Sequence, residues 1–258
     1  MSRLQLTFNC EGTTLAGTLD TAPGTSGLLI VSGGNEVRSG AFSGQAALAA
    51  RIARKGFPVF RFDRRGVGDS GGENRGFRKS RKDIEAALAA FRAIAPTVDR
   101  VVGFGNCDAA SALMLTEGAG FDALVLSNPW TIEETGTVPP PAAVRARYAD
   151  KLRNPREVLR LFSGGVNLGK LARGIVQAAR PGAPRSTLAR EIAAGLAAFQ
   201  GPARIVLASA DRTAQAFEAG WPQEDERVVR CAGATHAWVE PDAKVFLEGE
   251  LLAMLRGA

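Results

Sequence analysis

The sequence contains little of what several classes of protein need. It has one histidine, His236, and three cysteines, Cys10, Cys107 and Cys231. A metal site built from several histidines is therefore excluded, and three cysteines that lack zinc-site spacing cannot form a disulfide framework. We expect no metal and no cofactor, and the odd number of cysteines is typical of a reducing compartment.

The chain also lacks long apolar runs. No stretch approaches the roughly 20 residues of a membrane span, and residues 1–12 show neither the apolar core nor the cleavage pattern of a signal peptide. We therefore expect a cytoplasmic protein. The net charge is +6, but no aromatic residues are interleaved with the basic ones and no helix-turn-helix pattern is present, so we expect no nucleic-acid partner.

What the sequence does have is a regular alternation of apolar runs and helical patterns. The 258 residues are 45% hydrophobic and 22% charged, which suits one large domain with a core. The alternation predicts an α/β fold in which helices cover both faces of a mostly parallel, twisted sheet. The expected strands are residues 4–9, 13–20, 27–32, 57–62, 100–104, 122–128, 202–209 and 226–231, and the expected helices are 41–55, 80–94, one that starts at Cys107, and 241–256.

The alternation is interrupted between residues 131 and 186, where a Pro-rich turn and Gly pairs replace the strands. From Ala142 to Ile192, eleven basic residues face only three acidic ones. We expect a helical cap over 131–186, inserted into a core made of 1–130 and 187–258. Its basic face is either a solvated surface or an attractor for an anionic substrate or a membrane surface.

A nucleophile elbow is indicated by "GFGNCDAAS", residues 103–111. The segment places Cys107 at a sharp turn from a strand into a helix, and Gly105 and Ala109, two positions away on either side, are small. The positive end of the helix dipole favours a thiolate, whereas the charge of Asp108 beside it works against ionisation. The alternative is that Cys107 only packs as a small apolar residue, as we expect for the other two cysteines.

An acid and a base follow the last two expected strands, at the sheet edge where ligands bind. They are Asp211 and His236, and with Cys107 they give the chain order nucleophile, acid, base. His236 would favour the thiolate, either as an ion-pair partner or as the base that takes the thiol proton, and Asp211 would fix the imidazole tautomer. Asp225 and the pair Glu133 and Glu134 remain alternative carboxylates.

An oxyanion hole requires two N–H donors near the nucleophile. The backbone N–H of Asp108 is one candidate. The other comes from the "SGGN" loop, where we expect Gly34 and keep Asn35 as the alternative. Glycines at this place let the backbone approach a substrate closely.

Two local contacts are also expected. The segment "DRRGVGDSGG" lacks the Lys-Ser/Thr ending of a phosphate-binding loop, so we interpret it as a structural turn in which Asp63 and Arg65 pair. Ser80 is the expected cap of helix 80–94, with Asp83 three residues further on.

Four segments resemble those of one known family: "SGGN", "FDRRGVGDSGG", "GNCDAAS" and "GATHAW". The chain resembles α/β-hydrolase fold proteins, and most closely the exosortase A system-associated hydrolases of the first type, which have a cysteine at the elbow. This resemblance implies an α/β-hydrolase fold and a role beside exopolysaccharide synthesis and protein sorting.

The favoured function is a hydrolase that forms an acyl-enzyme on Cys107 from a small-molecule ester, thioester or lactone. The dienelactone hydrolases resemble this chain in having a cysteine elbow, which is why a lactone is included. Two alternatives remain. The same site could transfer the acyl group to an acceptor other than water, or the chain could be a non-catalytic binding or scaffold protein.

Overall fold

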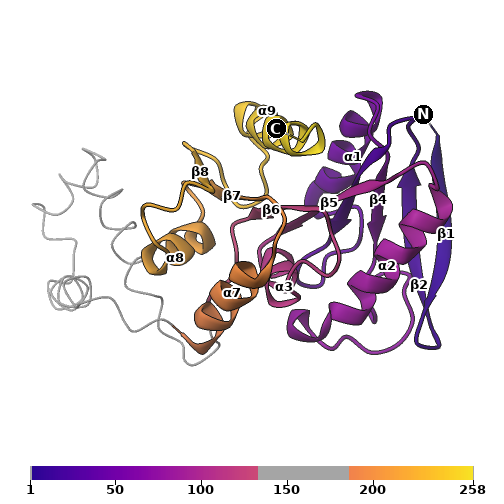
Figure 1. Cartoon of the computed structure of the whole chain (residues 1–258), viewed down its shortest axis with the longest axis horizontal. Helices are drawn as coiled ribbons and strands as arrows, with labels where there is room; N and C mark the ends of the chain where they lie inside the picture. Colours follow the sequence, from indigo (N-terminus) through magenta and orange to yellow (C-terminus); the bar gives the residue numbers. More distant parts are fainter. Residues whose placement is uncertain (1, 133–185, 258) are drawn as a thin grey trace, which may run out of the picture.

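The computed structural model describes residues 2–132 and 186–257, which form one eight-stranded sheet with helices on both sides (Figure 1). The strand order is β1-β2-β4-β3-β5-β6-β7-β8. The strands are β1 Arg3–Cys10, β2 Thr13–Asp20, β3 Ser26–Val31, β4 Val59–Phe62, β5 Arg100–Asn106, β6 Ala123–Ser127, β7 Ala203–Ala208 and β8 Val228–Cys231. The predicted cap, with its basic face, Glu133 and Glu134, lies almost wholly outside the described residues.

Six neighbouring strands, β4-β3-β5-β6-β7-β8, run parallel, and β2 runs antiparallel to both of its neighbours, β1 and β4. In register, Val31 lies opposite Gly105, and Asn106 lies opposite Ser127. The carboxyl ends of these strands therefore meet at one edge, which is where the predicted site residues follow. The predicted fold class, an α/β sheet covered on both faces, is confirmed.

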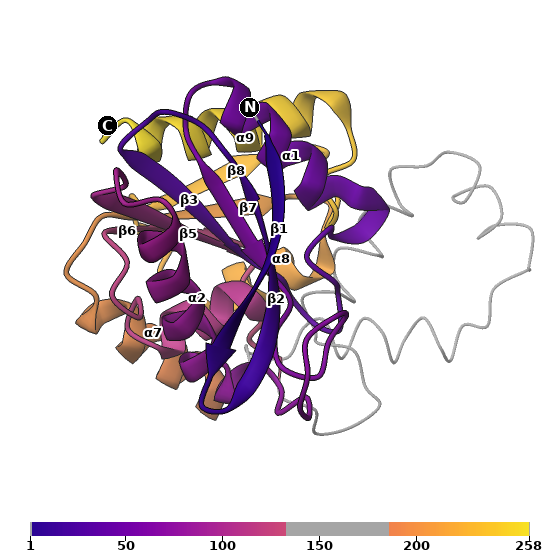
Figure 2. The same cartoon turned by 90° about the vertical axis from the view of Figure 1, so that its right-hand side faces the viewer.

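Helices cover the two faces of the sheet unequally (Figure 2). The helices are α1 Gly44–Arg54, α2 Arg81–Ile94, α3 Asp108–Leu115, α7 Thr187–Ala198, α8 Arg212–Gly220 and α9 Pro241–Leu255. One core cluster packs α2, α3, α7 and α8 against the sheet, and a second packs α1 and α9 against the opposite face. Within the described ranges, no helix is both long and apolar enough to cross a membrane.

The start of α1 differs from the expected helix 41–55. Residues Ala41–Ser43 form a short 3-10 turn, in which Phe42 and Ser43 have φ values of 52° and 56°. Positive φ interrupts a right-handed helix, so α1 begins only at Gly44. Two helices, α7 and α8, were not predicted.

The predicted pair between Asp63 and Arg65 is wrong. The Asp63 carboxylate instead receives both the backbone N–H and the guanidinium of Arg38. Arg65 turns to the other side of the turn and pairs with Asp83 at 3.2 Å. Arg38 therefore joins the segment after β4 to the loop after β3, and Arg65 joins the same segment to α2.

Ser80 is the N-cap residue of α2, as predicted, but the predicted capping box is wrong. The Ser80 side chain makes no cap bond to α2, because its hydroxyl accepts from Arg64 at 3.1 Å and donates to the Gly76 carbonyl at 3.2 Å. Asp83, the other member of the box, accepts the Arg65 N–H at 2.9 Å. Both side chains thus stabilise the loop after β4 and not the helix start.

Candidate active site

A sharp backbone turn presents Cys107 between β5 and α3. Its φ and ψ are 61° and −127°, a combination that side-chain-bearing residues rarely adopt. The Cys107 N–H donates to the Ser127 carbonyl at 2.9 Å, which fixes the turn on the neighbouring strand. Gly105 needs to be glycine, because a Cβ there would lie 2.6 Å from the Ala109 carbonyl carbon. The turn therefore has the form of the predicted elbow.

The structure brings together Cys107, His236 and Asp211, three residues from three different strand ends. Asp211 is the N-cap of α8, and its Oδ2 lies 2.8 Å from the Nδ1 of His236 on the loop after β8. The hydrogen bond that His236 donates to Asp211, followed by that with Cys107, raises the pKa of His236 to about 10. Because Nδ1 faces Asp211, the remaining ring nitrogen, Nε2, is the one available to Cys107.

Asp211 is a rigid support for the imidazole. It is only 7% exposed, and its carboxylate also accepts the N–H groups of Thr213 and Ala214, each at 3.2 Å. These bonds leave the carboxylate one orientation, which aims it at His236. The sequence predicted the pairing of the two residues but not this helix-capping role.

Asp225, the alternative acid, has other partners. Its carboxylate binds the Arg227 guanidinium at 2.8 Å and accepts the Trp221 indole N–H at 2.8 Å. The hydrogen bond from Arg227 is the main cause that lowers the pKa of Asp225 to about 2. Asp225 is therefore a structural ion-pair partner, and Glu133 and Glu134 lie outside the described residues.

The loop after β3 lies against the elbow, but its hydrogen bonds differ from those expected. The Gly34 N–H donates to Asp108 Oδ1 at 2.6 Å, so it is not a free oxyanion donor in this structure. The side-chain carbonyl of Asn35 accepts from Asn74 at 2.7 Å. The Asp108 N–H, at the start of α3, has no hydrogen-bond partner among the residues that the structure describes.

Arg64 was not predicted, and it balances the charge of Asp108. Its guanidinium is buried, donates to the Gly34 carbonyl and lies 3.6 Å from Asp108 Oδ2. Arg64 therefore joins the loop after β3 to the elbow. The signal in the sequence was the first arginine of "FDRRG", which follows β4 at the same sheet edge.

Asn106 was also missed, although it directly precedes Cys107. Its side-chain N–H donates to the His236 carbonyl at 3.1 Å, while its Oδ1 accepts from Ser127 and Asn128. Ser127 in turn accepts the Trp238 indole N–H at 2.9 Å. This network joins the loop that carries His236 to the ends of β5 and β6.

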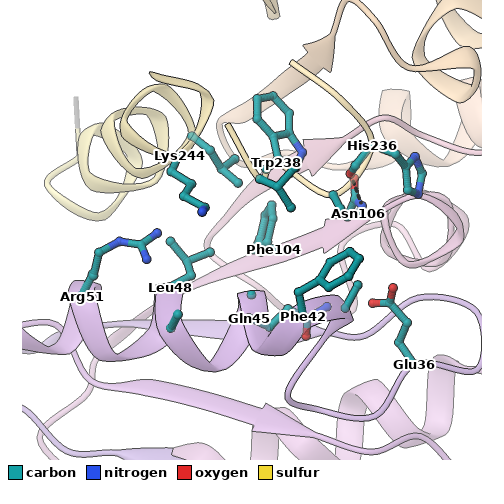
Figure 3. A pocket seen from close by; sticks show the side chains of 16 residues that line it. Glu36, Phe42, Gln45, Leu48, Arg51, Phe104, Asn106, His236, Trp238 and Lys244 are labelled. Atoms are coloured by element: carbon teal, nitrogen blue, oxygen red, sulfur yellow. Dashed lines mark hydrogen bonds between the residues drawn. The ribbon is translucent and has the colours of Figure 1, made fainter. Parts of the chain in front are cut away.

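A cavity of about 230 Å³ opens beside His236, between α1 and α9 (Figure 3). Phe104 and Trp238 contribute to its walls, and Asn106 lies at the same end as His236. In residues 2–132 and 186–257, no three His, Cys, Asp or Glu side chains are grouped so that they could hold a metal ion.

A parallel sheet with a sharp elbow at a strand end is the arrangement of α/β-hydrolase fold proteins, and comparison of this chain with known proteins agrees with that class. Residues 28–248 match the Alpha/beta hydrolase family, and the chain belongs to that family. A search of the curated proteins finds no match for this sequence.

Several solved structures are similar to the chain throughout its length. An α/β hydrolase from Penicillium sp. sh18, GrgF, is 19% identical with a TM-score of 0.65, over 99% of this chain and 98% of that one. The Pyrococcus furiosus esterase Pf2001 is 13% identical with a TM-score of 0.62, over 99% and 91%. A thioesterase domain from the curacin biosynthetic pathway is 14% identical with a TM-score of 0.55, over 98% and 100%. At these identities the likeness shows the fold.

Proposed function

We propose that this chain is a thiol hydrolase that cleaves a small-molecule ester, thioester or lactone through an acyl-enzyme on Cys107. The observation that carries the proposal is the continuous contact from Cys107 through His236 to Asp211. A cysteine at a strained turn, next to a histidine that a buried carboxylate holds in one orientation, is the arrangement of an activated nucleophile. The esterase and thioesterase among the structural neighbours are in keeping with this reaction class.

The first half of the reaction forms a bond from the Cys107 sulfur to the substrate acyl carbon. A pKa of about 10 keeps His236 protonated at neutral pH, so the imidazolium is the counter-charge for a thiolate. As the bond from the acyl carbon to the leaving oxygen or sulfur breaks, the imidazolium proton passes to that atom. An ester or thioester releases a neutral alcohol or thiol, a lactone opens to a hydroxyl that stays on the acyl chain, and His236 becomes neutral.

The second half hydrolyses the thioester. Neutral His236 takes a proton from water, the hydroxide adds to the acyl carbon, and the Cys107 sulfur departs as thiolate beside a renewed imidazolium. The side chain of His236 is 42% exposed, so water can reach it. An acceptor hydroxyl that took the place of water here would make the enzyme an acyltransferase.

The developing oxyanion is stabilised by backbone N–H groups. The Asp108 N–H is the first donor. The second is the Gly34 N–H, which the substrate oxygen gains by displacing the Asp108 carboxylate toward Arg64. Until a substrate arrives, the Asp108 carboxylate thus occupies the oxyanion position. Arg64 draws the negative charge of Asp108 away from the Cys107 thiolate.

The biological setting is proposed from the sequence resemblance. A cysteine elbow of the form "GNCDAAS" resembles the exosortase-associated hydrolases, which favours a role beside exopolysaccharide synthesis and protein sorting. All three cysteines are free, in keeping with the cytoplasm. Because the predicted basic cap lies outside the described residues, its affinity for an anionic substrate or a membrane surface stays a prediction.

The test is the rate at which iodoacetamide alkylates each cysteine, resolved by mass spectrometry, in the wild type and in His236→Ala. Cys107 should react rapidly near neutral pH and slowly in the variant. Cys10 and Cys231 are internal controls, because burial raises the pKa of both thiols. An acetyl adduct on Cys107 after treatment with an activated acetyl ester would add direct support. If Cys107 forms no adduct and reacts like an ordinary thiol, the proposal fails.

A further inference from the structure

The cavity beside His236 has two chemically different ends (Figure 3). His236 and Asn106 lie at one end, close to the elbow. The side chains of Arg51, from α1, and Lys244, from α9, converge at the other end. Cys107 itself does not line the cavity. Whatever occupies the cavity therefore contacts the acid–base residue and not the nucleophile.

The middle of the cavity is apolar. Leu48 and Leu247 face it from α1 and α9, and Phe104 and Trp238 come from the sheet and the histidine loop. Each of these four side chains is almost fully buried. Phe42 lines the same cavity but is 88% exposed, so an occupant could cover an aromatic ring that is otherwise in solvent.

The two cations at the far end have unused hydrogen-bonding capacity. Arg51 binds Glu248 through Nε at 2.6 Å, and in the described part of the chain its other guanidinium nitrogens have no partner. Lys244 makes no close ion pair with any described residue, although Glu240, one turn earlier on the chain, interacts with it electrostatically. Glu36, the acidic residue of the lining, lies at the His236 end (Figure 3). The far end of the lining therefore presents two cationic side chains with free N–H groups on an apolar wall, with Glu248 as the close partner of Arg51.

We propose that the cavity binds the leaving group of the substrate, and that this group is an alcohol or thiol with an apolar chain that ends in an anionic carboxylate or phosphate. The inference rests on the proposed function. In that mechanism His236 protonates the leaving atom, so the leaving group departs on the His236 side of Cys107, where the cavity lies. An anion at the chain's end would meet Arg51 and Lys244 and gain charge-assisted hydrogen bonds.

The distance between the two ends of the cavity sets a minimum length for the leaving group. Along α1, the lining runs from Gln45 to Arg51, which is six residues or roughly 9 Å of helix rise, and His236 lies beyond the Gln45 end (Figure 3). A leaving group of one or two carbons could not reach both ends at once. The preference for an anion should therefore appear only when several bonds separate it from the leaving atom.

The experiment compares acetyl thioesters that differ only in the leaving thiol. One thiol ends in a carboxylate, the second in its neutral methyl ester and the third in a phosphate, on chains of two lengths. With the longer chain, kcat/KM should be about tenfold or more higher for an anionic leaving group than for the neutral one, as one charge-assisted bond provides. If the carboxylate and phosphate arms differ, the better one identifies the anion.

Substitutions then locate the effect. Lys244→Met should reduce the ratio of anionic to neutral kcat/KM to near one, and Lys244→Arg should restore most of it. Lys55→Met is the matched control, because Lys55 is exposed just after α1 and outside the cavity; its ratio should equal that of the wild type. The rate of deacylation should be the same for all thioesters, since by then the leaving group has gone.

Three results would overturn the inference: equal kcat/KM for anionic and neutral thioesters, a preference that survives both Lys244→Met and Arg51→Met, or a preference that follows the anion when it is moved to the acyl half. Failure of the proposed function looks different, because then no thioester would leave an acetyl group on Cys107. If the adduct forms at rates that do not depend on the leaving-group charge, only the present inference fails.

Discussion

The strain at Cys107 can be tested by removing its side chain in two ways. The φ of 61° and ψ of −127° suit glycine and cost a residue with a Cβ about 1–3 kcal/mol. Cys107→Ala keeps the Cβ and hence the strain, whereas Cys107→Gly removes both. Each variant loses the nucleophile, so the difference in their stabilities isolates the backbone.

The expected difference follows from two opposing effects. Relief of strain favours glycine by about 2 kcal/mol, in the middle of the range given for such conformations. The greater freedom of glycine in the unfolded chain opposes this by about 0.5–1 kcal/mol. Cys107→Gly should therefore be more stable than Cys107→Ala by about 1 kcal/mol, which corresponds to a rise of roughly 2–4 °C in the melting temperature.

Urea unfolding of the two variants measures this difference. Ala194→Gly provides the control, because Ala194 is exposed on α7 and an ordinary helical position should lose about 1 kcal/mol on the same change. The two alanine-to-glycine comparisons should thus have opposite signs. If Cys107→Gly is less stable than Cys107→Ala by as much as the control, the elbow is not strained and the reasoning is refuted.

Three further predictions concern the surroundings of Cys107. The pKa of His236 is raised to about 10 from an ordinary 6.5, so its protonated form stabilises the fold fully below about pH 6.5, and this contribution is lost as pH rises through about 10. The urea midpoints of the wild type and His236→Ala should therefore differ most at low pH and converge above pH 10. A difference that does not change with pH would contradict this. Gly105→Ala should lose about 1–3 kcal/mol in urea unfolding, because the new Cβ meets the Ala109 backbone, which no rotamer change can relieve; an unchanged midpoint would count against the close packing. Arg64→Met should slow iodoacetamide labelling of Cys107, since the charge of Asp108 then has no cation beside it, and labelling at the wild-type rate would argue against that role.

The sheet was largely predictable from the sequence, because its strands are continuous apolar runs. β3 and β6, for example, are buried on both faces and bounded by glycine or polar turns, a pattern that few other structures give. The chain order of the candidate residues could be predicted for the same reason. Once the strands are placed, the edge at which Cys107, Asp211 and His236 lie follows from parallel topology.

The hydrogen bonds of the site could not be predicted, since they depend on which of several nearby polar groups compete. Asp63 had two arginines within three residues, yet it pairs with Arg38 from a distant loop. In the same way, the Gly34 N–H was expected to be free and is taken by Asp108. Residue type and spacing set neither outcome, because both depend on how closely the loops after β3 and β4 approach each other.

The order of the strands has a consequence for how the protein is made. β1 to β6 occupy six adjacent places in the sheet and end at Ser127, so they are all synthesised before the chain reaches residue 133. Domains begin to assemble from the N-terminal side during synthesis. The elbow with Cys107 can thus form on the ribosome well before Asp211 and His236 emerge. A nascent chain therefore carries the Cys107 thiol without His236 beside it, and under the proposed mechanism the thiol becomes active only when β7 and β8 complete the sheet.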